Sequence, residues 1–153
     1  EISECLVGSE MCIRDSYRRD GYDFDARYDE GLAKHTDKVL YDLLDSHAPI
    51  ISKELKKLGD YRKGGNKGFD TAIIRLQEQC YVITSNFAYM TDKNGQPYGW
   101  GVAEYSTPEK FMGAAFTDKV YQREPEESYQ LILDHLKKIL PQASMEQIKK
   151  ILK

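Results

Sequence analysis

The chain has few of the residues from which disulfides, metal centres or membrane segments are built. Its only cysteines and histidines are Cys5, Cys12, Cys80, His35, His47 and His135. None of these shows the close spacing of a metal-ligand motif, and a single cysteine beyond residue 16 excludes a disulfide framework there. No apolar run approaches the ~20 residues that span a bilayer. These absences indicate a cytoplasmic protein with no metal, no other cofactor and no membrane partner.

The first sixteen residues follow no pattern of regular structure. Residues 6–16, "LVGSEMCIRDS", have neither the helical nor the strand period, and they lack the parts of a secretory leader. Back-translated, they fit one reading frame of a transposase adapter used to prepare sequencing libraries. We therefore expect residues 1–16 to be an adapter-derived artefact. We also expect the natural N-terminus, which would precede Tyr17, to be missing from this chain.

Positive charge is concentrated in one segment of an acidic chain. Residues 52–75 hold seven basic and three acidic side chains, a net charge of +4, so the total of −3 leaves −7 for the rest. A net charge of −3 spread evenly would argue against nucleic acid as a partner. Local charge decides whether a phosphate backbone can be engaged, so this segment keeps nucleic acid open.

The pattern of apolar residues and turn signals predicts helices and one hairpin. We expect helices at 33–48, 52–59 and 68–80, with Ser52 as an N-cap and Pro49 ending the first helix. Strands near 81–91 and 98–106 flank the turn signal Asn94-Gly95. A short helix after Pro108, a helix at 125–140 and a last helix capped by Ser144 follow. Residues 17–32 are polar without clear period and are predicted to be a linker.

The order of helix, short helix, helix and hairpin is that of a winged helix-turn-helix. We therefore predict an α+β fold, with a winged helix-turn-helix and its two-stranded wing at 33–107 and a C-terminal helical extension at 108–153. We expect the helix at 125–140 to pack across the winged helix or to pair with another copy as a homo-oligomer. Two functions stay open at this point: binding of duplex DNA, and a protein-interaction or scaffold module that does not bind DNA.

The DNA-binding hypothesis assigns contacts to the basic segment. Lys67, Thr71 and Arg75 are spaced by four on the third helix, so they share a face that can enter one groove. Arg75 would reach a guanine edge or a phosphate. The expected backbone contacts are Arg62, Lys63 and Asn66 at the helix entrance, Lys53, Lys56 and Lys57 on the second helix, and Lys93, the only cation of the wing.

Other candidate sites have simpler structural interpretations, which we favour. The acidic Asp23, Asp25, Asp29 and Glu30 would suit Mg²⁺, but a solvated linker explains them better. We interpret Cys80 as a small buried residue and not a nucleophile. Trp100 is expected in the core, which leaves Tyr98 as the better candidate for stacking on a base. Ile74 is an apolar residue on an otherwise polar helix face.

Three segments, "ELKKL", "KGFDTAIIRLQ" and "YGWGVAEYS", resemble the bacterial AlkZ-related proteins, and the similarity extends over about residues 20–140. These proteins are winged-helix relatives of the AlkZ and YcaQ DNA glycosylases, which excise alkylated bases and act on crosslinks. The resemblance implies a DNA-binding architecture and a link to DNA repair. It leaves open whether this chain is itself an enzyme.

The AlkZ enzymes use a Gln-x-Gln motif to position the attacking water, and Gln77-Glu78-Gln79 has the same spacing. In the enzymes the middle residue is apolar and the motif lies toward the N-terminal part. Here the middle residue is acidic and the motif closes the third helix. We therefore interpret Gln77 and Gln79 as the polar end of an amphipathic helix, and expect any catalytic counterpart in the missing N-terminal segment.

Overall fold

A computed structural model describes residues 23–118 and 122–151 of the chain. The predicted artefact at 1–16 and the start of the predicted linker lie outside these residues. The chain divides into two compact units, one at Tyr22–Phe116 and one that includes Thr117–Lys153. Each unit is described by itself.

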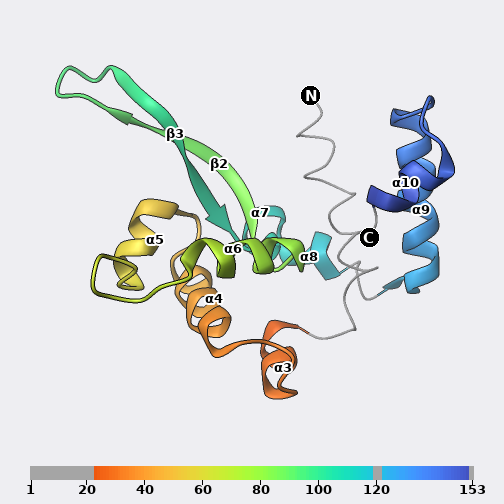
Figure 1. Cartoon of the computed structure of the whole chain (residues 1–153), viewed down its shortest axis with the longest axis horizontal. Coiled ribbons are helices and arrows are strands. Elements are labelled where there is room, and N and C mark those ends of the chain that lie inside the picture. The colour runs from red at the N-terminus through yellow and green to blue at the C-terminus, as the bar shows by residue number, and fades with distance from the viewer. Residues whose placement is uncertain (1–22, 119–121, 152–153) are drawn as a thin grey trace. The chain divides into compact units, whose positions relative to one another are not determined.

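The first unit combines helices with a three-stranded antiparallel sheet of order β1-β3-β2 (Figure 1). Its elements are α3 (Phe24–Asp29), α4 (His35–His47), β1 (Ile50–Ile51), α5 (Ser52–Leu58), α6 (Phe69–Glu78), β2 (Ile83–Thr91), β3 (Pro97–Ser106), α7 (Pro108–Met112) and α8 (Ala114–Thr117), whose last residue passes the unit boundary. The α+β class is confirmed, and each predicted helix and strand is present with shifted ends.

Part of the predicted linker folds as a helix. Asp23 caps α3 by accepting a hydrogen bond from the amide of Ala26 at 2.7 Å. Phe24 is buried, and its ring lies 4.4 Å from that of Tyr41 and 5.1 Å from that of Tyr81. The sequence predicts residues 17–32 to be a linker. Residues Phe24–Asp29 instead form a helix, because Phe24 in this polar segment packs into the core.

The core of the first unit combines the apolar stripes of the predicted helices with residues outside them, such as Phe24 and Ile50. It comprises Phe24, Leu40, Leu44, Ile50, Leu55, Phe69, Ala72, Ile73, Leu76, Tyr81 and Val82. Cys80 is also buried, as expected, but it lies beyond the end of α6 and has a positive φ of 64°. The buried residues of α6 pack this helix on one side against α4, and the opposite side of the helix is exposed.

Two local predictions need correction. Ser52 is the first residue of α5 and not its N-cap, which is Ile51, because β1 runs directly into the helix. The α7 helix, predicted to start the C-terminal extension, belongs to the first unit.

The hairpin turn forms where the sequence places it. A side-chain oxygen of Asp92 accepts hydrogen bonds from the amides of Asn94 at 2.8 Å and Gln96 at 2.9 Å, and Gly95 has a φ of 78°. Backbone hydrogen bonds from Gln96 and then Asn94 lower the pKa of Asp92. The turn therefore joins β2 and β3 through an ionised carboxylate.

The second unit contains α9 (Pro125–Ile139) and α10 (Met145–Ile151). They share a small core of Ile132, Leu133, Leu136 and Ile148. The Ser144 hydroxyl accepts from the amide of Gln147 at 3.3 Å, and the Gln147 side chain accepts from the amide of Ser144 at 2.8 Å. This reciprocal pair is a capping box, and it confirms Ser144 as the predicted cap. No helix among the described residues is long and apolar enough to cross a membrane.

Candidate nucleic-acid interface

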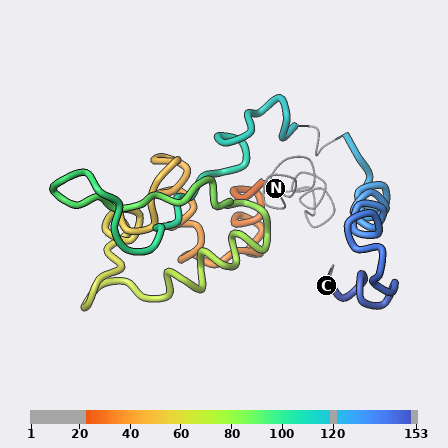
Figure 2. Tube along the Cα trace, turned by 90° about the horizontal axis from the view of Figure 1, so that it is seen from above, coloured from red at the N-terminus to blue at the C-terminus, as the bar shows by residue number. Residues whose placement is uncertain are grey.

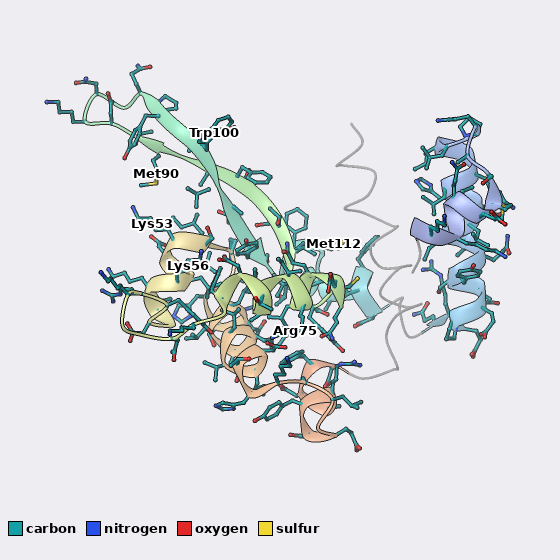
Figure 3. All side chains as sticks on the ribbon, in the orientation of Figure 1. Lys53, Lys56, Arg75, Met90, Trp100 and Met112 are labelled. Carbon is teal, nitrogen blue, oxygen red and sulfur yellow. The ribbon has the colours of Figure 1, made fainter. Side chains whose placement is uncertain are left out.

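The predicted basic segment occupies α5 and the loop that joins it to α6. Figure 2 shows this loop extending outward from the helices that flank it, and Figure 3 shows Lys53 and Lys56 on α5. Lys53, Lys57, Lys63 and Lys67 are exposed. In the part of the chain that the structure describes, these four form no ion pair. They are therefore the predicted contacts whose charge is most available to an external anion.

Lys56 and Arg62 are partly neutralised by acidic neighbours. The ammonium of Lys56 lies 3.0 Å from a carboxylate oxygen of Asp70 and 4.6 Å from the centre of the Phe69 ring. Lys56 thus ties α5 to the start of α6. Arg62 lies 3.8 Å from Asp60, and both side chains are exposed, so this pair contributes little to stability.

The loop is closed by hydrogen bonds within itself. Asn66 donates from its side chain to the carbonyl of Gly59 at 2.9 Å and from its backbone to the carbonyl of Asp60 at 2.8 Å. A Cβ at Gly65 would lie 2.1 Å from that same Asp60 carbonyl oxygen, so the chain passes itself too closely for any side chain there. Asn66, a predicted phosphate contact, is therefore engaged in holding the shape of the loop that presents Arg62 and Lys63.

The α6 helix starts later than the sequence indicates. Its first residue is Phe69, and Gly68 before it is left-handed, with a φ of 85°. Lys67 therefore lies in the loop and not on the helix, and the predicted face of three residues at spacing four is wrong for that residue. Thr71 is exposed within α6, as expected.

Arg75 is engaged by a residue of α4. Its Nε donates to Oδ2 of Asp37 at 2.9 Å, and its Nη2 donates to Oδ1 at 2.6 Å. The Asp37 residue is only 3% exposed. Its hydrogen bonds raise the pKa of Arg75, which therefore stays charged. The guanidinium of Arg75, predicted to reach a guanine edge or a phosphate, thus uses two of its donors to hold α6 against α4.

The sequence prediction missed Asp37, although a signal was present. It lies three residues before Leu40 and seven before Leu44, both of which are buried. A carboxylate on a buried stripe needs a partner, and the spacing could have identified one. Asp37 is the residue that explains the position of Arg75.

Both glutamines of the Gln-x-Gln segment make hydrogen bonds within the fold. The side chain of Gln77 donates to the hydroxyl of Thr84 at 3.0 Å, which links α6 to β2. Gln79 is the C-cap of α6, and its amide donates to the carbonyl of Arg75 at 3.0 Å. Within the described residues, no three His, Cys, Asp or Glu side chains are grouped so that they could hold a metal ion.

The acidic residues near the N-terminal end of the unit also have structural partners. Asp23 caps α3, and Asp25 lies 3.2 Å from the ammonium of Lys38. All four acidic residues of this group are exposed, as the solvated interpretation expects, but they lie in α3 or at its caps and not in an unstructured linker.

The hairpin differs from the prediction at its aromatic residues. Trp100, expected in the core, is 94% exposed. The register of β2 and β3 shifts between Ala88 and Met90, and Gly99 opposite has a φ of 75°, so the strand does not turn Trp100 inward. Lys93 lies exposed in the turn. The hairpin thus offers aromatic surface and little charge.

Comparison with known proteins identifies the family. The sequence profile of the family described as AlkZ related matches residues 13–153. The chain belongs to the AlkZ-related family. The match begins within the last residues of the adapter-like segment and continues through both units. No curated protein and no solved structure shows significant similarity to the chain.

Proposed function

We propose that the first unit is a winged helix-turn-helix that binds duplex DNA, in a cytoplasmic protein linked to DNA repair. The order α4-β1-α5-α6-β2-β3, with β1 paired to β3, supports the winged-helix assignment. In such a fold α6 takes the place of the helix that enters the major groove, and the β2–β3 hairpin is the wing. The repair link rests on membership of the AlkZ-related family.

The main support for this proposal is a group of four exposed lysines that form no ion pair within the described residues: Lys53, Lys57, Lys63 and Lys67. All four are exposed on α5 or the loop before α6, in a segment with a net charge of +4. Cations that neutralise phosphates release counterions, and this gives DNA binding its affinity and its salt dependence. Thr71 on the exposed side of α6 remains a candidate for a groove contact. Arg75 acts as a positioning residue.

Titration with duplex DNA tests the proposal. Fluorescence anisotropy of a labelled duplex, measured with the full chain from about 50 to about 200 mM salt, should give an affinity that falls steeply with salt. Replacing both Lys63 and Lys67 with alanine should weaken binding and reduce the slope of log K against log salt by roughly 2.

A matched control removes the same charge elsewhere. Lys149 and Lys150 are exposed on α10 of the second unit, so their double alanine variant changes net charge equally. It should bind DNA nearly as the unchanged chain does. Equal losses in the two double variants, or no binding at low salt, would contradict the proposal.

A protein-interaction module is the second candidate function, and one observation favours it. Ile74 is 52% exposed on α6, and Leu58 at the end of α5 is also exposed. Apolar residues in a central position often carry the binding energy of protein interfaces. A homo-oligomer is a related proposal, since Leu131 and Ile139 of α9 are exposed. Sedimentation of the full chain at increasing concentration tests it.

A further inference from the structure

The β2–β3 hairpin carries four large aromatic side chains that are mostly exposed. Phe87 is 58% exposed, Tyr89 61%, Tyr98 56% and Trp100 94%. Leaving this much apolar surface in water is unfavourable, and contiguous exposed patches commonly mark interaction sites. The DNA contacts proposed above use none of these four residues.

Two of the four aromatic residues, Phe87 and Tyr89, lie on one side of the hairpin, where a Cβ at Gly101 would contact both. Tyr98 is paired with Met90, and Trp100 precedes Gly101 in β3, so alternation along the strands does not place these two on that side. Figure 3 shows Trp100 extending from the hairpin. We call the exposed surface of Phe87, Tyr89, Tyr98 and Trp100 the aromatic face.

Two glycines shape this face. A Cβ at Gly101 would lie 3.2 Å from Cβ of Phe87 and 3.4 Å from Cζ of Tyr89, so the Tyr89 ring lies close over bare backbone. Gly99, with its positive φ, lies next to Trp100 within the register shift between the Ala88 and Met90 pairings. Trp100 therefore stands between two residues without side chains, with both faces of its indole accessible.

The charged residues near the aromatic face indicate which kind of partner can bind there. The charged residues of the hairpin are Asp92 and Lys93 in the turn and Glu104 near its base, where Glu104 accepts from the Ser85 hydroxyl at 3.0 Å. A single cation cannot hold a phosphate backbone. Neutral π faces suit the faces of nucleic-acid bases, and the cations of α5 and the following loop lie in the same unit to hold the phosphates.

We propose that the aromatic face stacks against unpaired bases, so that the preferred partner is DNA with a locally unpaired stretch and not an intact duplex. This inference rests on the proposed DNA binding and names the substrate class of that site. Bases in an intact duplex are already stacked on their neighbours, so only unpaired bases present a face to Trp100.

A second copy of the chain is a less suitable occupant. The β2 strand lies at the edge of the sheet, but its ladder with β3 is interrupted between Thr84 and Asn86 and again between Ala88 and Met90. Irregularities of this kind oppose pairing between edge strands of two molecules. The edge of the hairpin is therefore poorly suited to extend the sheet of a partner chain.

Trp100 is the only tryptophan of the chain, so its fluorescence reports on this face alone. The full chain is titrated with a duplex that contains a central unpaired bubble and with a fully paired duplex of equal length. We expect the bubble to quench Trp100 emission and to bind about tenfold more tightly. Anisotropy of the labelled DNAs should show that Trp100→Ala loses this preference and keeps its affinity for the paired duplex. Trp100→Phe should keep part of the preference.

Phe111→Ala is the matched control, because Phe111 is an exposed aromatic residue of α7 outside the hairpin. It should leave the preference unchanged. Equal affinity for the two DNAs, or no quenching while the paired duplex still binds, would overturn the stacking proposal and leave the proposed function standing. Loss of binding to both DNAs would overturn both. A Trp100 emission shift that depends on protein concentration without DNA would assign the face to a second copy.

Discussion

Arg75 of α6 and Asp37 of α4 are joined by two partly buried hydrogen bonds, of 2.9 Å and 2.6 Å. The pair orients α6, because Asp37 is almost completely buried and the Arg75 side chain must reach inward to meet it. The exposed side of α6 then presents Thr71 and Ile74. A basic residue within a proposed DNA-binding helix therefore contributes through position and not through contact.

Replacing Arg75 with methionine is expected to lower the free energy of unfolding by about 3 kcal/mol, because it leaves the Asp37 carboxylate buried without its partner. Chemical denaturation followed by circular dichroism measures this loss. The double variant Asp37→Leu/Arg75→Met should recover much of it, since an apolar pair of similar volume carries no desolvation penalty. Full DNA affinity in the folded double variant would agree with a positioning role. A loss equal to that of a direct phosphate contact would contradict it.

Much of the fold could be predicted because its signals are local. The stripes of α4 and α6, the Asn94-Gly95 turn and the Ser144 cap each depend on residues within one or two turns of chain. The pairing of Arg75 with Asp37, 38 residues apart, depends on how two helices cross, and no local pattern encodes this. Trp100 shows the same limit, because a bulge set by two strands together decides which way its side chain faces.

The loop between α5 and α6 gives a prediction that changes no charge. Gly65→Ala should weaken duplex DNA binding by about as much as removal of one lysine contact, roughly three- to tenfold, because its Cβ would clash with the Asp60 carbonyl and displace Arg62 and Lys63. Anisotropy at low salt measures the affinity. The slope of affinity against salt should fall with it, since both cations move. An unchanged affinity with a correctly folded variant would show that the loop shape is unimportant for binding.

The turn of the hairpin should depend on acid pH. Hydrogen bonds hold the pKa of Asp92 below its ordinary value, so its ionised form stabilises the folded turn above the unfolded pKa near 4. This stabilisation is lost as pH falls through the folded pKa. The protection factors of the Asn94 and Gln96 amides, which divide out the intrinsic pH dependence of exchange, should fall when NMR follows exchange from neutral pH to below about pH 4. In Asp92→Asn the exchange rates, corrected for intrinsic pH dependence, should show no such transition.

Gln77 is expected to act in stability and not in catalysis. Gln77→Ala and Thr84→Val should each cost about 1 kcal/mol of unfolding free energy, since each removes one partner of the same hydrogen bond. The double variant should cost less than the sum of the two, because the interaction is lost only once. Urea denaturation of the four proteins completes the cycle. Release of an alkylated base from duplex DNA that is abolished by Gln77→Ala alone, with Thr84→Val active, would instead assign Gln77 to a reaction.

Ile74 and Lys67 distinguish the two candidate functions of this surface. If the surface binds DNA, Lys67→Ala should lower duplex affinity about three- to tenfold, since it removes one phosphate contact, whereas Ile74→Ala should change it less than twofold. If the surface binds a protein, the exposed Ile74 should be the more sensitive position, because truncation of an apolar anchor removes buried contact area. Both side chains are exposed, so neither substitution disturbs the core, and circular dichroism should show unchanged folding. A greater loss of duplex affinity in Ile74→Ala than in Lys67→Ala would contradict an electrostatic mode of DNA binding.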